Sequence, residues 1–209
     1  MQARSIAIGC LLGAAFSLTA AYAFSQDGAL LDVQYDMEVA QHAQSTGPQH
    51  EFLAKMAGDW AVDYKIYFSG PDGPAMETTG TSTVEVVLDG RFVLERSSAS
   101  FPMPDGQGGM AAMEVEGMGL TGYDRHKKLF VGSWADSLNT HLLTMSGAMS
   151  PDGKKLTMYG YMDEPGLGVN GRMVKYVSHI ISDDERRFEI TDLHAGDDYK
   201  VVELTYRRK

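Results

Sequence analysis

The sequence predicts an all-β protein: a single up-and-down antiparallel barrel of about ten strands, preceded by a short helix and a cleavable signal peptide. Three observations lead to this fold class. After Trp60 the chain falls into short runs in which apolar and polar residues alternate. Turn residues separate these runs at intervals of roughly 8 to 12 positions. No second helical pattern interrupts them, and a sheet without covering helices is best protected by closing on itself. A β-sandwich is the alternative fold.

The segment 1–23 predicts a secretory signal peptide. Arg4 is its only charge, a small and apolar run follows, and Ala21-Tyr22-Ala23 fits an A-x-A cleavage site. A permanent membrane anchor is the alternative, but glycine and hydroxyl residues within the run make a weak spanning helix. Lipidation at Cys10 is disfavoured because too little apolar sequence precedes it. We therefore expect a periplasmic or secreted protein that is cleaved near Ala23.

The composition argues against several kinds of partner and site. The chain has 18 basic and 28 acidic residues, and Arg4 is the only charged residue of the signal. This excess of acid argues against nucleic acid and against anionic membrane surfaces, which need clustered Lys and Arg. No later apolar run reaches spanning length, so we expect no membrane span in the mature chain. Cys10 is the only cysteine, so the mature chain is expected to lack disulfides and thiolate metal sites.

A leader and a short helix are expected before the barrel. Polar residues dilute the apolar ones throughout the leader, which predicts a poorly ordered or helical segment. Pro48 fits the first turn of a helix that would run to about Met56 and be capped by Gly58. One face of this helix, suited to plugging the end of a barrel, comprises Phe52, Leu53 and Met56. The predicted organisation is signal 1–23, leader 24–48 and barrel domain 49–209.

The first strand sets the pattern for the barrel domain. Trp60, Val62, Tyr64, Ile66 and Phe68 occupy every second position, the period of a strand with one face in a core. The later strands are separated by turns rich in Gly, Asp and Pro, which accept the backbone angles that a tight turn demands. The predicted strands span residues 60–68, 76–88, 91–101, 110–120, 128–136, 140–149, 155–162, 172–181, 186–194 and 199–207.

Several stretches of the sequence resemble a known family. Gly58-Asp59-Trp60 opening the first strand, with a basic end of the last strand, looks like the calycin arrangement of lipocalins and fatty-acid-binding proteins. The series LAKMAGDW, LDGRFVLE, GYDRHKKLFVGSWADS, GAMSPDGKKLTM and VELTYRRK is similar to an uncharacterised bacterial family, the DUF1579 family. This resemblance covers about residues 50–209. It implies a calycin-like barrel and carries no activity that transfers to this chain.

In calycins a basic side chain at the end of the chain lies over the early tryptophan, and strand parity suggests the same contact here. If residues 202, 204 and 206 face inward, Arg208 shares their face and reaches Trp60. A cation–π pair of this kind stabilises by roughly 0.5 to 2 kcal/mol. The predicted structural residues are therefore Gly58, Trp60 and Arg208. A solvated basic tail is the alternative.

The stretch from Phe130 to Gly147 predicts a hairpin that carries the candidate site. A two-residue turn at Leu138-Asn139 would set Asp136 opposite His141, close enough for the carboxylate to hold an imidazole nitrogen. As a catalytic pair, Asp136 would orient His141 as a general base. The alternative is a cross-strand pair that stabilises the hairpin tip, which the frequency of such pairs in sheets favours. The candidate ligand-binding residues are Trp134, Asp136, His141, Leu143, Met145 and Tyr64.

The predicted barrel and its apolar inner face together favour a protein that binds a small, largely apolar ligand in the lumen of the barrel. One alternative is an enzyme, an isomerase, lyase or hydrolase that uses the Asp136–His141 pair. Another is a structural or envelope protein whose lumen is filled by side chains. Neither a cofactor nor a metal is expected. His50-Glu51 lacks the second histidine of a zinc-protease motif, and the methionines between residues 103 and 118 favour an apolar lid over a copper site.

Overall fold

The structure is a computed structural model that describes residues 23–24, 30–31 and 36–209. The chain divides into two compact units, Met1–Gln41 and His42–Lys209. Before the barrel lie an antiparallel pair of short strands, β1 (Ala23–Phe24) and β2 (Leu30–Leu31), and helix α1 (Met37–Gln44). The predicted signal peptide, apart from Ala23, lies outside the described residues. Within the described ranges, no helix combines the length and apolar character needed to cross a membrane.

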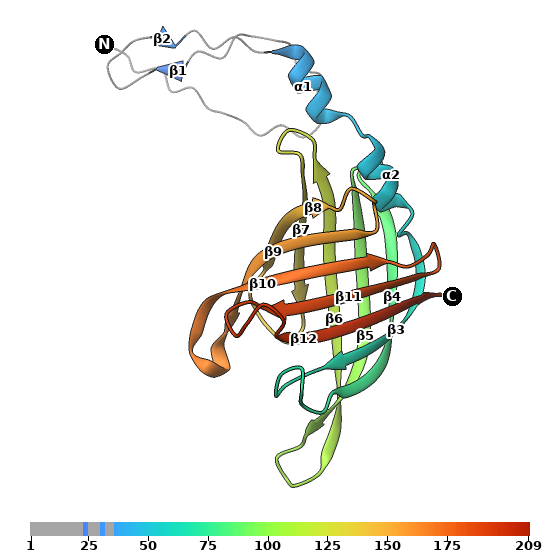
Figure 1. The fold of residues 1–209 in the computed structure, drawn as a ribbon, viewed down its shortest axis with the longest axis vertical. Coiled ribbons are helices and arrows are strands. Elements are labelled where there is room, and N and C mark those ends of the chain that lie inside the picture. Colours follow the sequence, from blue (N-terminus) through green and yellow to red (C-terminus); the bar gives the residue numbers. More distant parts are fainter. Residues whose placement is uncertain (1–22, 25–29, 32–35) are drawn as a thin grey trace, which may run out of the picture. The chain divides into compact units, whose positions relative to one another are not determined.

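The second unit contains a closed antiparallel barrel, in which each strand pairs with the next and the last pairs with the first (Figure 1). The predicted up-and-down barrel is confirmed. Closure pairs both sides of every strand, which explains how this many strands remain protected without covering helices. The strands are β3 (Gly58–Ile66), β4 (Met76–Val87), β5 (Phe92–Pro104), β6 (Met110–Asp124), β7 (Leu129–Asp136), β8 (Leu143–Met149), β9 (Lys155–Glu164), β10 (Val169–Ile180), β11 (Glu185–Asp192) and β12 (Lys200–Arg208).

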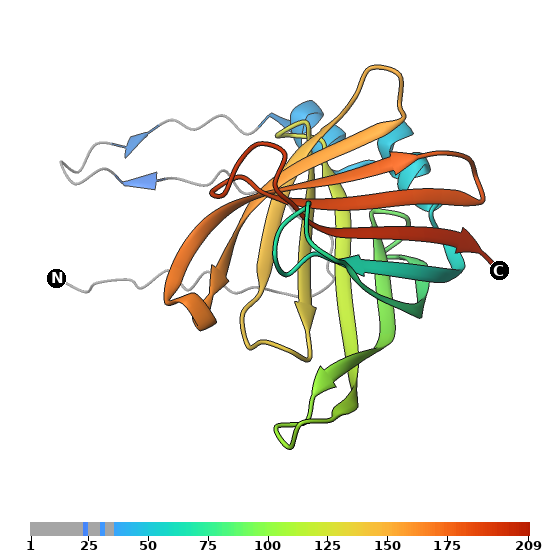
Figure 2. The same ribbon diagram turned by 60° about the horizontal axis from the view of Figure 1, so that its bottom comes forward.

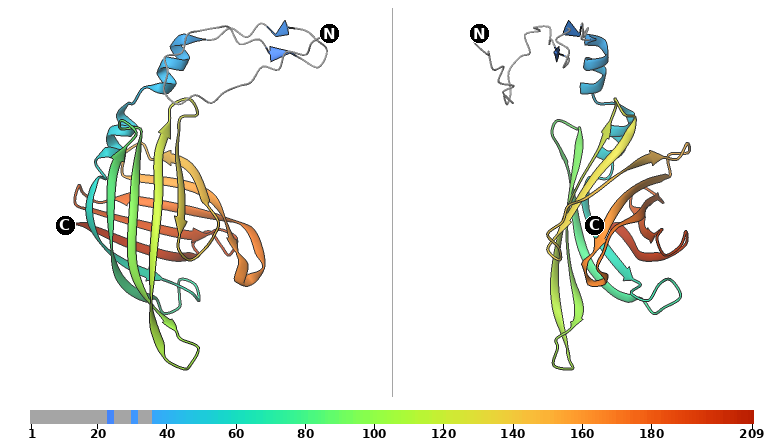
Figure 3. Two further views of the ribbon diagram at one scale, coloured as in Figure 1. Left: turned by 180° about the vertical axis from the view of Figure 1, so that it is seen from behind. Right: turned by 90° about the vertical axis from the view of Figure 1, so that its left-hand side faces the viewer.

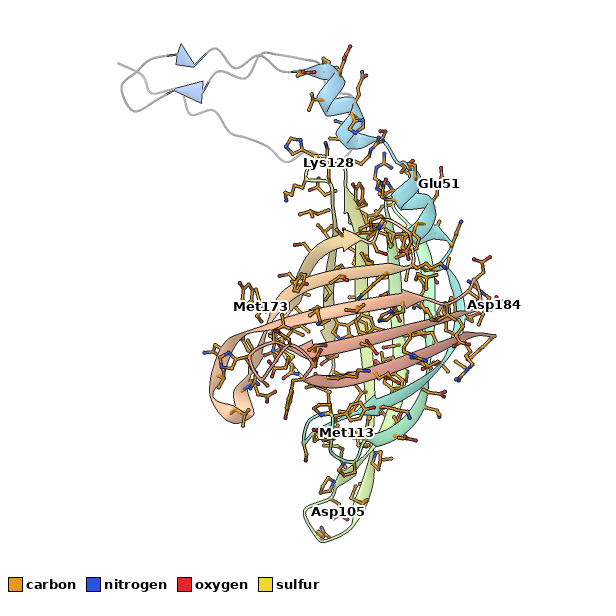
Figure 4. The ribbon with its side chains drawn as sticks, viewed as in Figure 1. Glu51, Asp105, Met113, Lys128, Met173 and Asp184 are labelled. Carbon is orange, nitrogen blue, oxygen red and sulfur yellow. The ribbon has the colours of Figure 1, made fainter. Side chains whose placement is uncertain are left out.

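The barrel wall consists of two crossing halves. Strands β3 to β7 form one curved wall, and β8 to β12 cross it at a steep angle, in front of it in Figure 1 and behind it in the left view of Figure 3. The hairpin of β5 and β6 extends well beyond the other strands at one end (Figure 2). Asp105 and Met113 mark this extension, whereas Asp184, in the turn between β10 and β11, lies at the right-hand side of the barrel (Figure 4).

Helix α2 (Pro48–Ala54) covers the end of the barrel opposite to the extended hairpin (Figure 1). Its Leu53 is only 1% exposed and belongs to the core, and Phe52 packs edge-on against Phe130 with 6.1 Å between ring centroids. The plug predicted from the apolar face of this helix is therefore present. We call this the closed end, and we call the opposite end, where β3 is followed by β4 and β5 by β6, the open end.

The hydrophobic core lies toward the closed end because the inward residues there are almost completely buried. Trp60 is 2% exposed, Val62 is 1% exposed and Val174 is 0% exposed. They alternate with outward residues, as the period-two pattern predicts. The other buried members of this core include Val84, Val93, Phe130, Leu156, Met158, Tyr176, Leu204 and Tyr206.

The predicted end of the first barrel strand, at Phe68, is wrong. β3 ends at Ile66, and Phe68 is 70% exposed rather than inward. The chain turns directly after Phe68, where Gly70 has φ +85° and donates from its amide to the Tyr67 carbonyl oxygen, 3.3 Å away. A Cβ at Gly70 would lie 2.7 Å from the Tyr199 ring, so a turn with a close approach replaces the last two strand residues.

Arg208 closes the barrel against its first strand. It stands opposite Trp60 in the β12–β3 register, with its guanidinium carbon 4.3 Å from the indole centroid. Gly58 makes room for it, since a Cβ at that position would lie 2.3 Å from the Arg208 Nη1 atom and the residue has φ +135°. The guanidinium also donates to the carbonyl oxygens of Lys55, Ala57 and Asp183. Arg208 thus joins the end of α2, the β10–β11 turn and the first strand.

Candidate functional site

The inner wall of the barrel becomes more accessible toward the open end. Tyr176 and Trp60 in the closed half are buried, but many inward residues nearer the open end are partly exposed, although Phe101 and Asp192 stay buried there. Water therefore reaches an apolar inner surface from the open end. The partly exposed apolar residues of this wall include Tyr64, Ile66, Trp134, Leu143, Met145, Met162, Ile190 and Val202.

Trp134 lies flat against two glycines of the neighbouring strand. Gly119 is its partner in the β6–β7 register. A Cβ at Gly117 would lie 2.2 Å from the indole Cζ2, and a Cβ at Gly119 would lie 2.9 Å from Cε3. The indole Nε1 donates to Asp136 Oδ2 over 3.1 Å. The ring is therefore held by the two glycines on one side and by a hydrogen bond at its edge, and it belongs to the inner face of β7.

The predicted hairpin register is present in the structure, but its turn is not. Trp134 pairs with Leu143 and Gly132 pairs with Met145, as the alternation indicated. Four of the proposed ligand-binding residues, Trp134, Asp136, Leu143 and Met145, thus lie together on β7 and β8. Tyr64 lies on a different strand, β3, edge-on to Phe101 with 5.6 Å between ring centroids.

The predicted two-residue turn at Leu138-Asn139 is wrong, because β7 ends at Asp136 and a longer loop connects it to β8. Pairing between β7 and β8 ends at Trp134 and Leu143, while the Ser137 amide continues the ladder to β6 by donating to the Glu116 carbonyl oxygen over 2.9 Å. Asp136 Oδ1 accepts from the Leu138 amide at 3.0 Å, which bends the chain there. His141 consequently falls in the loop between β7 and β8. Both Asp136 oxygens have donors other than His141, so the carboxylate serves to orient Trp134.

A polar cluster lies inside the barrel between strands that are not neighbours. Glu95 on β5 accepts from Ser82 Oγ at 2.7 Å and from Arg186 Nη2 at 3.5 Å. Arg186 comes from β11, and its guanidinium carbon lies 4.0 Å from the centroid of the Tyr206 ring and 5.2 Å from that of Trp60. Only 8% of the Arg186 side chain and 19% of the Glu95 side chain are exposed. The pair is thus formed across the lumen in a largely dry environment.

The tyrosines of this interior keep their protons at neutral pH. Burial raises the pKa of Tyr206 well above its usual value, and the nearby Glu95 charge raises it further. Burial also raises the pKa of Tyr64, although a hydrogen bond with Ser97 opposes the shift. For Tyr176, burial raises the pKa to about 12. Their hydroxyl groups can therefore act as hydrogen-bond donors.

A second ion pair lies on β10 and β11. Arg172 contacts Asp192 through its Nη2, and only 14% of the Arg172 side chain and 6% of the Asp192 side chain are exposed. Asp192 Oδ1 also accepts from the His194 amide at 3.0 Å. Glu95, Arg172 and Tyr176 are among the polar strand residues that the sequence allows to reach the interior. Arg186 was missed, although it shares the parity of Phe188 and Ile190, and that was the signal that could have found it.

Two surface hollows lie away from Trp134. One, of about 560 Å³, is on the outer face of β3, β4 and β12, where Lys65 pairs with Glu77 at 3.1 Å. The other, of about 170 Å³, is at the closed end between α2 and the turns before β9 and β11. Trp60 and Arg186 contribute to its lining. The outer hollow has the paired charges of an ordinary solvated surface.

Comparison with known proteins identifies a family but no function. No curated protein is significantly similar to the sequence. Among solved structures, a redesigned β-barrel matches 79% of this chain and 99% of its own, with 14% sequence identity and a TM-score of 0.37. That score is too low to carry an argument about this chain. Residues 45–208 match the family model described as "Protein of unknown function (DUF1579)". Since the match spans most of the sequence and the whole barrel, the chain belongs to the DUF1579 family.

Proposed function

We propose that the protein binds a small, largely apolar molecule in the open half of its barrel. One observation carries the proposal: the indole of Trp134, which is only partly buried on the inner face of the barrel, is held against Gly117 and Gly119 and by a hydrogen bond to Asp136. A large aromatic surface held in one orientation pays little conformational entropy when a ligand stacks on it. A binding surface needs its aromatic ring to be held in place, and here two glycines make room for the ring while a carboxylate orients it.

The apolar wall opposite and beside the indole supports the same function. Met145 and Leu143 lie on the next strand, and both are only partly buried although they face inward. A ligand would remove this apolar area from water, at a gain of about 25 cal/mol per Å². The closed half is filled by side chains, from Leu53 of the helix to Val174, so the apolar body of the ligand would lie in the open half.

Binding can be tested by titrating the purified protein with Nile red, a neutral apolar dye, while dye and tryptophan fluorescence are recorded. Gly117→Ala places a methyl group where the Trp134 ring now lies and should displace the ring. We expect dye affinity to fall by about tenfold, equivalent to about 1.4 kcal/mol. The matched control is Gly166→Ala in the loop before β10, where the nearest atom to a new Cβ is a Glu164 carboxylate oxygen at 3.4 Å.

The result has a clear negative outcome. If Nile red binds Gly117→Ala as tightly as the wild type, or binds neither protein, the stacking surface is not a ligand site. Native mass spectrometry of protein purified from its own host provides an independent measurement, because a bound small molecule adds its mass to the folded protein.

We also propose that the protein functions outside the cytoplasm. The apolar run and the Ala21-Tyr22-Ala23 sequence support this, as does a chain whose only cysteine precedes that site. The intact mass of protein from the periplasm or medium should correspond to a chain that begins at Phe24. Recovery of only the uncleaved chain, from the cytoplasm, would contradict export.

A further inference from the structure

Four charged side chains that face the lumen are already paired within the wall. Arg186 is paired with Glu95, and Arg172 is paired with Asp192. Each of these four side chains is less than one fifth exposed. A charge in such a place costs free energy unless it has a counter-ion and hydrogen-bond partners. A carboxylate or ammonium group on a ligand would find its counter-ion in this part of the lumen already occupied.

The same wall has hydrogen-bond donors that no described part of the protein satisfies. They are the Nε atoms of Arg172 and Arg186 and the hydroxyl group of Tyr176. Tyr176 is 3% exposed and stands between Met158 and Ile190 in the sheet registers, on the inner face of β10. Unpaired buried donors are costly, so the site is suited to a molecule that brings an acceptor.

Taken together, these groups define the chemistry of a ligand. We infer that the lumen takes a neutral, largely apolar molecule with an oxygen acceptor, such as an ester or a ketone, and discriminates against free carboxylates. This inference rests on the proposed function, because it specifies the ligand class of the same site. The apolar part of the molecule would stack on Trp134 toward the open end, and its acceptor would meet the donors along β10 and β11.

A matched pair of ligands tests the inference. Methyl octanoate and octanoate have the same acyl chain, and only the second carries a charge at neutral pH. Each would be used to displace Nile red from the purified full chain, with direct calorimetry as a second measurement that does not depend on the dye. We expect methyl octanoate to bind at least about tenfold more tightly than octanoate, a difference of about 1.4 kcal/mol.

Variants assign the selectivity to the paired arginine. Glu95→Gln removes the carboxylate from Arg186 and should raise the affinity for octanoate by about tenfold, while the affinity for methyl octanoate changes by less than about threefold. Asp63→Asn is the control, because Asp63 pairs with Arg207 on the outer face and should leave the selectivity unchanged. Tyr176→Phe should weaken methyl octanoate by about threefold to tenfold if its hydroxyl group is one of the donors. Melting curves establish that each variant is folded.

The outcomes separate the two proposals. If neither ligand binds and Nile red does not bind, the proposed function fails and the ligand class falls with it. If both ligands bind but the wild-type protein binds octanoate as tightly as methyl octanoate or more tightly, only the neutral-ligand inference is overturned. Since that comparison uses the wild-type protein, it holds even if Glu95→Gln does not fold. An unchanged selectivity in folded Glu95→Gln would contradict the role given to the Arg186–Glu95 pair.

Discussion

Replacing Arg186 by Met should destabilise the barrel by about 3 kcal/mol or more, one of the largest losses expected from a single substitution in this chain. The guanidinium group lies against the Tyr206 and Trp60 rings and is the cation closest to Glu95 among the contacts that the structure describes. Methionine fills much of the same volume, but it leaves the Glu95 carboxylate inside the barrel without a counter-ion. Urea unfolding, followed by circular dichroism, measures the loss.

Two further variants separate the buried charge from lost packing. The double variant Arg186→Met with Glu95→Leu removes both charges and should recover about 1 kcal/mol or more of the loss. Arg207→Met breaks a pair with Asp63 in which both side chains are about half exposed, and it should cost less than about 1 kcal/mol. A loss for Arg186→Met as small as that for Arg207→Met would mean that the inner pair is solvated and carries little energy.

The barrel could be predicted from sequence because its information is local. Apolar residues at every second position and Gly-Asp-Pro turns fix strands and connections without any knowledge of distant contacts. The predicted strand boundaries are wrong where local signals conflict. The predicted strand 91–101 is too short, because β5 continues to Pro104. The extension is stabilised by its own turn, where Asp105 Oδ1 accepts from the amides of Gln107 and Gly109 at 2.8 and 2.9 Å.

In the candidate site, too, contacts within one hairpin could be predicted from the sequence, whereas contacts between distant strands could not. The pairing of Trp134 with Leu143 followed from parity within one hairpin. The Arg186–Glu95 pair could not be derived, because β5 and β11 are not neighbours in the sheet and the two residues meet only across the lumen. The glycine floor beneath Trp134 is a similar case: Gly117 and Gly119 look like turn or flexibility signals until the ring is seen above them.

The contact between Trp60 and Arg208 leads to the other large expected effect. Trp60→Leu should cost about 3 kcal/mol, since the indole is 2% exposed, packs edge-on against Tyr206 and donates from Nε1 to the Met56 carbonyl oxygen at 3.1 Å. Arg208→Ala should cost about 2 kcal/mol, because its guanidinium group satisfies carbonyl oxygens at the end of α2 and in the β10–β11 turn.

The double variant tests whether these two residues act on each other. We expect the combined loss to fall short of the sum by about 1 kcal/mol, the coupling of a cation held against a ring face. Unfolding free energies of the wild type, both single variants and the double variant give this coupling directly. Losses that add to within about 0.3 kcal/mol would show that Arg208 stabilises the barrel through its carbonyl contacts alone. In that case the Trp60 ring would serve the core without the cation, and Gly58 would still be required by its φ of +135° and by the room that it leaves for the arginine.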